Sequence, residues 1–130
     1  MAKKQIILCD SNIIIDAIND VKVVKNELNN IGSENVLISV ITEIEVINGA
    51  INKEMQKSFI KKLKKYNIIH IDTKTSFKAS SLIKKYKLSH GLDIPDAFIA
   101  ATVLIHNLPL YTNNLKDFKF IEGLILYNPK

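Results

Sequence analysis

Four carboxylates each lie beside a short apolar run, where the chain would leave a strand or enter a helix. They are Asp10, Glu45, Asp96 and Asp117. In an open parallel α/β sheet, functional groups gather beyond the carboxyl ends of the strands. Carboxylates packed together repel one another unless a cation joins them. Oxygen ligands without His or Cys favour Mg²⁺ or Mn²⁺, and such an ion suits the hydrolysis of phosphodiester bonds.

The alternation of apolar runs predicts an α/β fold, with a parallel sheet covered by helices on both faces. Strands are predicted at 5–9, 36–41, 67–71, 108–112 and 123–127. Helices are predicted at 11–19, 21–31, 42–51, 58–66, 73–86 and 93–106. The chain shows no linker, repeat or low-complexity stretch, so these elements predict one domain over residues 1–130.

The first two acids also have a purely structural explanation. Asp10 precedes Ser11 and Asn12, and any of the three could cap the next helix. Thr42 and Glu45 have the spacing of a capping box, with Thr42 as the N-cap. A cap needs only one such residue, however, and a side chain at Glu45 would point back over the first turn, towards Asp10. The metal hypothesis and the capping hypothesis therefore both remain open for Glu45.

The other two acids have similar alternatives. Asp93 can cap the helix that follows it, and an acid at Asp96 would suit the helix dipole. The residues after Asp96 are so apolar that this end of the helix should lie in the interior, where a charge needs a partner. Asp117 follows the strand predicted at 108–112 and could be a simple turn residue. The joint placement of all four acids favours a metal site.

The basic residues of this chain are all Lys. The 130 residues hold 18 Lys and no Arg, and the net charge is +5. This excess fits a polyanionic partner such as nucleic acid, but it fits solubility and an AT-rich coding sequence equally well. The lysine runs in the helices at 58–66 and 73–86 favour solvated faces. Contacts to phosphate would have to come from Lys, a backbone N–H or a metal, because no Arg fork is present.

The sequence also predicts a compartment. No apolar stretch is long enough to span a bilayer, and the run at 5–9 is too short for a signal peptide. The single Cys9 lies inside that apolar run, which predicts a buried, reduced thiol. We therefore expect a cytoplasmic protein without a membrane partner.

Four segments of the chain resemble the motifs of PIN-domain nucleases, and they come in the order of that family. They are ILCDSNIIID at 7–16, ISVITEIEVINGA at 38–50, DIPDAFIAAT at 93–102 and LPLYTNNLKDF at 108–118. Any one of these motifs is weak evidence, whereas their combination is specific and covers nearly the whole chain. In size and layout the chain most resembles the VapC-type toxins of bacterial toxin–antitoxin modules.

This resemblance implies a PIN-like three-layer α/β/α sandwich with a parallel five-stranded sheet. It implies a Mg²⁺- or Mn²⁺-dependent endoribonuclease that acts on RNA, forms a homodimer and is neutralised by a cognate antitoxin protein. By position, Asp10, Glu45 and Asp96 match the metal-site acids of the family. The fourth site position is either Asn114 or Asp117, and we prefer Asp117 because it carries the charge.

The expected mechanism is metal-assisted hydrolysis, with Glu45 as a ligand or as the base that orients water. Ser11, Asn12 and Thr112 would orient the ligands or bind phosphate. Where many PIN-domain relatives carry Arg, this chain has Asn113. Two alternatives within the family are a non-catalytic domain that binds RNA or protein, and a housekeeping RNA-processing nuclease.

Two other classes of protein fit less well. A response-regulator receiver domain would need an acid after the strand at 36–41, and none is in place there. A haloacid-dehalogenase-like phosphatase would need Asp at the position of Asn12.

Overall fold

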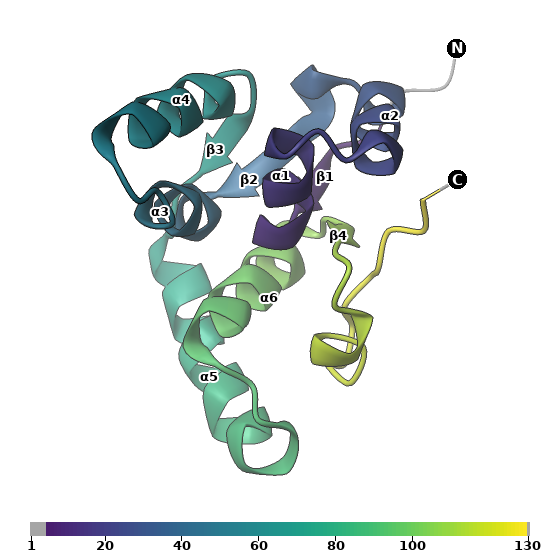
Figure 1. The fold of residues 1–130 in the computed structure, drawn as a ribbon. Coiled ribbons are helices and arrows are strands. Elements are labelled where there is room, and N and C mark those ends of the chain that lie inside the picture. The colour runs from purple at the N-terminus through teal and green to yellow at the C-terminus, as the bar shows by residue number, and fades with distance from the viewer. Residues whose placement is uncertain (1–4, 130) are drawn as a thin grey trace.

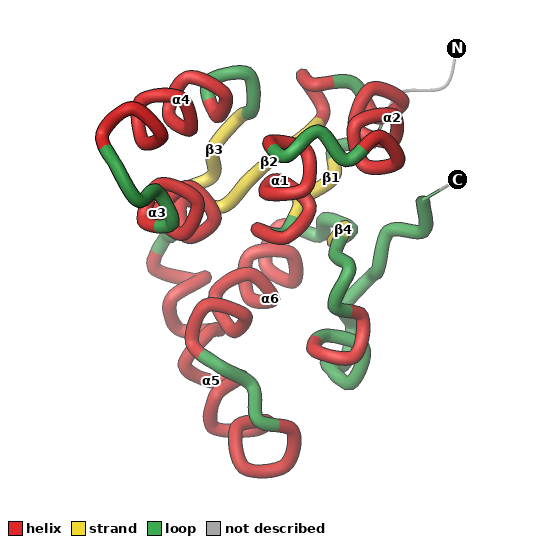
Figure 2. The backbone as a smooth tube through the Cα atoms, viewed as in Figure 1, coloured by secondary structure: helices red, strands yellow, loops and turns green. Residues whose placement is uncertain are grey.

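A computed structural model describes residues 5–129; residues 1–4 and Lys130, which belong to the predicted domain, lie outside the described residues. Figures 1 and 2 show short strands at the centre with helices around them. In chain order the elements are β1 (Ile7–Cys9), α1 (Ser11–Ile18), α2 (Lys22–Ile31), the 3₁₀ helix η1 (Ser33–Asn35), β2 (Val36–Ser39), α3 (Val40–Asn48), α4 (Lys53–Leu63), β3 (Asn67–Ile69), α5 (Thr73–His90), α6 (Ile94–His106), β4 (Leu110–Tyr111) and the 3₁₀ helix η2 (Leu115–Asp117).

The sheet is parallel throughout, with the strand order β3-β2-β1-β4. The chain moves from β1 outward through β2 to β3, and then returns to place β4 on the other side of β1. The direction of winding therefore reverses between β1 and β4. In open α/β sheets, ligands bind in the crevice beyond the carboxyl ends of the strands at such a switch point.

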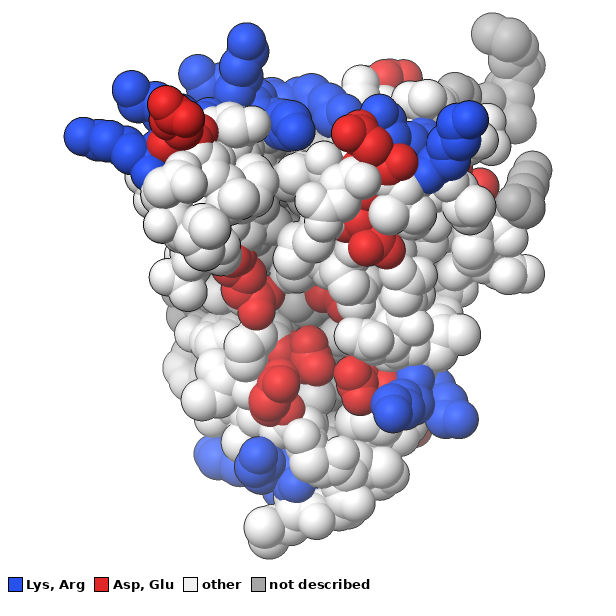
Figure 3. Space-filling model, viewed as in Figure 1, with Lys and Arg blue, Asp and Glu red and all other residues white. Residues whose placement is uncertain are grey.

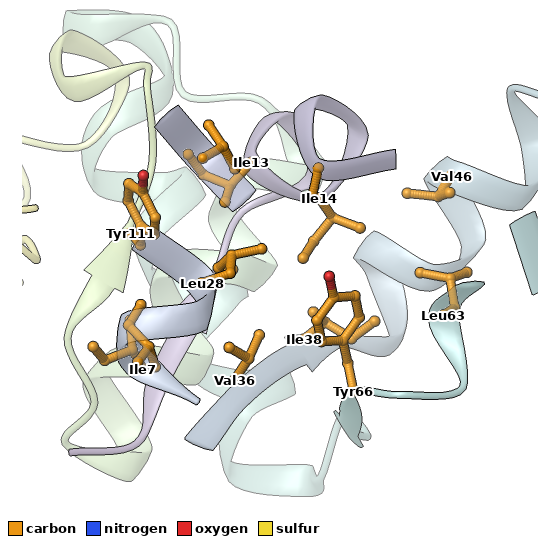
Figure 4. Packing of buried hydrophobic residues seen from close by; sticks show 14 residues of the cluster. Ile7, Ile13, Ile14, Leu28, Val36, Ile38, Val46, Leu63, Tyr66 and Tyr111 are labelled. Carbon is orange, nitrogen blue, oxygen red and sulfur yellow. The ribbon is translucent and has the colours of Figure 1, made fainter. Parts of the chain in front are cut away.

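Alternation along the strands gives each face of the sheet its own core. Ile7 and Cys9 of β1 pack on one face with buried side chains of α1 and α2, and Figure 4 shows this cluster. Leu8 and Leu110 pack on the other face with buried side chains of α5 and α6. This is the period of two expected of strands buried on both sides. The three-layer α/β/α arrangement is therefore confirmed.

The prediction of five strands is wrong by one strand. Residues 123–127 run alongside β4 but form only one bridge, between Leu126 and Leu110. Two backbone hydrogen bonds hold them there: Leu110 N–H donates to Ile125 O (2.9 Å), and Tyr127 N–H donates to Leu110 O (2.7 Å). β4 itself has only two residues, so it offers little edge for a longer ladder.

The structure also corrects the start of the third helix. Ser39, not Thr42, is the N-cap of α3, because its side chain accepts a hydrogen bond from Ile41 N–H at 3.0 Å. Thr42 is fully buried in the first turn. The capping-box hypothesis for Thr42 and Glu45 is therefore wrong.

Two other helices are longer than predicted. α4 begins at Lys53 rather than at residue 58, because Asn52 caps it by accepting from Met55 N–H at 2.8 Å. α5 continues to His90, where Gly91 ends it in the left-handed conformation with a φ of 70°. A glycine adopts that conformation without the steric cost that other residues meet. None of the helices within residues 5–129 combines the length and the apolar character needed to cross a membrane.

Candidate active site

Asp10 lies at the switch point of the sheet, directly after β1. The pairing of Cys9 with Tyr111 brings the next residue of each strand, Asp10 and Thr112, together. Thr112 Oγ1 donates to Asp10 Oδ2 at 2.8 Å, and Ser11 N–H donates to Asp10 Oδ1 at 2.8 Å. Asp10 thus caps α1 and also bonds across the sheet, so capping alone does not account for its contacts. The residue as a whole is only 5% exposed.

Burial raises the pKa of the Asp10 carboxyl. The nearby charges of Glu45 and Asp117 raise it further, while the hydrogen bonds from Thr112 and the backbone of Ser11 oppose the rise. Asp10 is therefore held in place by donors and yet lies among other negative charges. This is the situation that a bound cation would relieve.

Ser11 connects α1 to α3. Its Oγ donates to Glu45 Oε1 at 2.6 Å and lies 3.2 Å from Thr42 Oγ1. Glu45 is otherwise exposed, so this contact fixes the orientation of a carboxylate that would move freely on the helix surface. Thr42 was not among the predicted site residues. Its position directly after the strand predicted at 36–41 was a signal that Thr42 could belong to the site, but the capping-box pattern assigned it to the helix cap.

Hydrogen bonds that involve side-chain amides connect the loop after β4 to α1. Asn113 N–H donates to Asn12 Oδ1 at 3.2 Å, and Asn113 Nδ2 donates to Asp16 Oδ2 at 3.0 Å. Asn12 Nδ2 in turn donates to Asp10 Oδ2 at 3.3 Å. Asn12 and Asp16 are one helical turn apart, so they face the same neighbour. That spacing was a signal for Asp16, which was not among the predicted site residues.

Asp96 comes from the opposite layer, in the first turn of α6. Asp93 caps this helix by accepting from Asp96 N–H at 3.0 Å, which confirms the predicted cap. Burial and, after it, the charges of nearby carboxylates together raise the pKa of the Asp96 carboxyl to about 7. The carboxylates contribute to this rise in the order Asp93, Asp10, Asp117 and Glu45. The four predicted acids therefore lie close enough to act on one another.

Asp117 ends η2, and Asn114 precedes that turn. The charge of Asp117 raises the pKa of both Asp10 and Asp96, which places it beside the other acids. Asn114 is held differently: its backbone N–H donates to Thr112 Oγ1 at 3.0 Å, and its side chain is exposed. Asn114, the N-cap of η2, makes no capping hydrogen bond with its side chain, and Phe118 after the turn is fully buried.

Figure 3 shows acidic side chains gathered in a hollow in the middle of one face, with lysines towards the edges of that face. Within residues 5–129, no three His, Cys, Asp or Glu side chains are already arranged as a finished metal site. Nearby carboxylates nevertheless raise the pKa of Asp10 and of Asp96, and a bound cation would relieve that repulsion. The oxygen-only donor set fits a hard cation such as Mg²⁺ or Mn²⁺.

The segments that carry these side chains agree with a known family. Residues 7–123 match the PIN domain. The chain belongs to the PIN-domain family. The match spans every strand of the sheet and all four acids, so the fold and the family are established together.

Among characterised PIN-domain proteins, the chain is similar to Ribonuclease VapC1 of Methanocaldococcus jannaschii, with 33% identity over 127 residues. That match covers 94% of this chain and 87% of the relative. A toxin–antitoxin complex from Klebsiella pneumoniae contains a chain with 33% identity and a TM-score of 0.78, covering 95% of this chain and 99% of that one. VapBC2 from Rickettsia felis, bound to a DNA fragment from its promoter, gives 30% identity, a TM-score of 0.77 and coverage of 95% and 98%.

The raised pKa of Asp96 should make the stability of the ion-free PIN domain depend on pH. Between the ordinary value of 3.8 and about 7, the folded state holds a proton that the unfolded chain has lost. Stability from this group is therefore complete at low pH and is lost as the pH rises through about 7. We expect urea unfolding in EDTA to show a loss of about 2 kcal/mol between about pH 5 and about pH 8, after allowance for solvent screening. Asp96→Asn should remove this loss, and an unchanged loss in the variant would assign it to other groups.

Proposed function

We propose that this PIN domain is an endoribonuclease that hydrolyses RNA phosphodiester bonds with the help of Mg²⁺ or Mn²⁺. The observation that carries this proposal is that Asp10, Glu45, Asp96 and Asp117, from four separate segments, lie close enough for the other three charges to raise the pKa of Asp96. The ribonuclease named among its relatives supports the same activity. The net charge of +5 around an acidic hollow is compatible with a polyanionic substrate.

In this proposal Asp10, Asp96 and Asp117 hold the ion, and Glu45 is a further ligand or the base that orients water. When bound, the ion lowers the pKa of a coordinated water and stabilises charge on the scissile phosphate. These residues fit a divalent ion because the pKa values of Asp96 and Asp10 are raised by burial and by neighbouring acids. A cation beside such carboxylates stabilises their charged form.

The chain's own residues would set the geometry. Thr112 and Asn12 hold one oxygen of Asp10, while the backbone of Ser11 holds the other. The Ser11 hydroxyl directs Glu45 towards the same hollow. Donors of this kind fix the orientation of ligands, and their loss commonly costs about 10–100-fold in metal affinity.

We expect Asp117 to contribute more to ion binding than Asn114. Asp117→Asn removes a charge that acts on Asp10 and Asp96, so it should weaken Mn²⁺ binding by about tenfold in calorimetry. Asn114→Ala should change the affinity little, because the described contact of Asn114 is made by its backbone. The reverse order would place the Asn114 amide oxygen among the ligands and leave Asp117 as a turn residue.

We further propose that the protein is the toxin of a toxin–antitoxin module and acts on RNA in the cytoplasm. Its similarity to a chain of the Klebsiella pneumoniae toxin–antitoxin complex supports a cognate antitoxin as its partner. A homodimer is part of the same proposal. The exposed apolar side chains of Phe77 on α5 and Ile94 at the start of α6 offer surface for it, being 74% and 66% exposed.

The direct test of this function is incubation of the protein with single-stranded and structured RNA, with Mn²⁺ or Mg²⁺ and with EDTA. Internal cleavage that requires the ion is the expected result. Binding of RNA without ion-dependent cleavage would instead support a non-catalytic PIN domain. Cleavage unaffected by EDTA would rule out the metal hypothesis.

A further inference from the structure

A second hollow lies beside the acidic site, and the proposed mechanism does not use it. It has a volume of about 530 Å³, within the range of about 300–1,000 Å³ that is usual for sites of small ligands. Its walls come from α2, from the end of β4 with the loop after it, and from the C-terminal segment. The residues that line it include Val23, Glu27, Tyr111, Thr112, Asn113 and Tyr127. We call this hollow the Glu27 pocket.

The Glu27 pocket shares a wall with the acidic site. Thr112 lines the pocket and also donates to Asp10 at 2.8 Å. Asn113 lines it as well, and its backbone N–H donates to Asn12 at 3.2 Å. A chain of nucleotides whose phosphate lies at the carboxylates would therefore have a neighbouring nucleotide at the mouth of this pocket.

Glu27 is the unusual residue of the pocket, because it is an acid that is only 4% exposed. It lies on the inner face of α2, at helical spacing from the buried Val24, Leu28 and Ile31. A buried carboxylate is costly unless hydrogen-bond donors compensate it. The helical spacing was a signal in the sequence that this acid would be buried.

One donor to Glu27 comes from the C-terminal segment. The Tyr127 hydroxyl donates to Glu27 Oε2. Burial and this hydrogen bond raise the pKa of Tyr127 to about 12, so the hydroxyl keeps the proton that it donates. Within residues 5–129, no side chain or backbone group donates to the other oxygen, Glu27 Oε1. The pocket thus contains a carboxylate with remaining capacity to accept hydrogen bonds.

Two tyrosines form another part of the wall: Tyr127 is partly exposed, whereas Tyr111 is buried. Tyr111 and Tyr127 lie with their ring centroids 5.3 Å apart and their planes tilted by 56°. Unstacked RNA bases are commonly held against aromatic side chains and read along their Watson–Crick edges. A phosphate, in contrast, would be repelled by Glu27. The chemistry of the pocket therefore favours a base over the backbone of a nucleic acid.

We propose that the Glu27 pocket receives a guanine from the nucleotide next to the scissile phosphate, with Glu27 accepting hydrogen bonds from the edge of that base. This inference rests on the proposed RNA substrate. Guanine alone among the four bases carries a ring N–H beside an exocyclic amino group on its Watson–Crick edge. Adenine and cytosine place a ring acceptor beside the amino group, and uracil places its N–H between two carbonyl oxygens. Each of these acceptors would face the Glu27 carboxylate unfavourably.

The first test is the base preference of cleavage in a pool of random single-stranded RNA with Mn²⁺. The wild type should cut with guanine enriched at one fixed position beside the cut. Glu27→Gln should reduce that preference about tenfold, because it replaces one accepting oxygen with a donor. Val23→Phe should reduce it as well, because Val23 is 77% exposed at the wall of the pocket and a larger ring would obstruct the space. An identical base profile in the wild type and Glu27→Gln would overturn the proposal.

The matched control is Asn29→Phe. Asn29 is exposed on α2 and lies about 200° around the helix from Glu27, at 100° per residue. This variant introduces the same ring on the same helix and should leave the base profile unchanged. A thermal melt of each variant would show whether the fold is retained.

A second measurement separates the pocket from the nuclease activity. Guanosine should shift the ring resonances of Tyr127 in the wild type, inosine should do so more weakly because it lacks the amino group, and adenosine should have little effect. Glu27→Gln should lose the response to guanosine. Absence of RNA cleavage with an intact guanosine response would contradict the proposed function alone. Equal responses to guanosine and adenosine would overturn the guanine site, whatever the nuclease assay shows.

Discussion

Asp96→Asn should reduce ion-dependent RNA cleavage by about a thousandfold while the fold is retained, because a metal site supplies several kcal/mol of transition-state stabilisation. Asp96 is the strongest choice for this change. Its pKa is raised to about 7 by burial and by the surrounding acids, so its charge opposes the folded state when no ion is bound. Loss of that charge should therefore not destabilise the ion-free protein. Initial cleavage rates at a fixed Mn²⁺ concentration would measure the effect.

Asp93→Asn is the matched control for this variant. It makes the same chemical change at the same end of α6, three residues earlier, and Asn is as good a helix cap as Asp. Cleavage by the control should stay near the level of the wild type. If Asp96→Asn cut RNA at the normal rate, Asp96 would not be a ligand. Equal losses in the two variants would assign the effect to this end of α6 as a whole and not to Asp96 alone.

Mn²⁺ or Mg²⁺ should raise the melting temperature of the wild type by about 8 °C at an ion concentration about a hundred times the dissociation constant. The estimate follows from mass action, which gives about 2.7 kcal/mol at that ratio, and from the usual size of the melting shift per kcal/mol. The physical reason is the repulsion among acids at the switch point, which an ion removes. Melting would be followed by circular dichroism in EDTA and at increasing ion concentrations.

The control for this shift is the double variant Asp10→Ala/Asp96→Ala. Its melting temperature in EDTA is not the quantity to compare, since loss of Asp10 also removes the cap of α1. The quantity to compare is the change caused by the ion, which should nearly vanish. An ion-induced rise equal to that of the wild type would show that the ions bind elsewhere.

The sequence was sufficient to place the acids at one edge of the sheet. Asp10 follows β1 directly, Glu45 lies in the helix after β2, and Asp117 follows β4, so parallel pairing necessarily brings them near each other. Asp96 could be added because the apolar character of α6 required its first turn to lie inside. These are consequences of periodicity and strand direction, which local sequence contains.

The sequence could not show which of several similar polar residues would cap a helix or form a given hydrogen bond. Ser39 and Thr42 are both good caps, and the choice depends on Thr42 being buried next to Ser11. The contact between Thr112 and Asp10 joins residues 102 positions apart, and the register of β1 with β4 determines it. The prediction of a fifth strand at 123–127 was wrong for a similar reason, since the length of a strand depends on the neighbour with which it pairs.

The single cysteine, Cys9, can serve as a natural probe for the separation of the central strands of the sheet. It is fully buried in β1, which is paired on both sides, and burial raises the pKa of its thiol. A thiol reagent can react with it only when the central strands separate, so the labelling rate reports the population of that open state. Cys9 directly precedes Asp10 in the chain. An ion held by Asp10 should therefore slow the labelling of Cys9. The ratio of the labelling rates without and with the ion would give the free energy by which the ion stabilises the closed sheet, and no engineered label is needed.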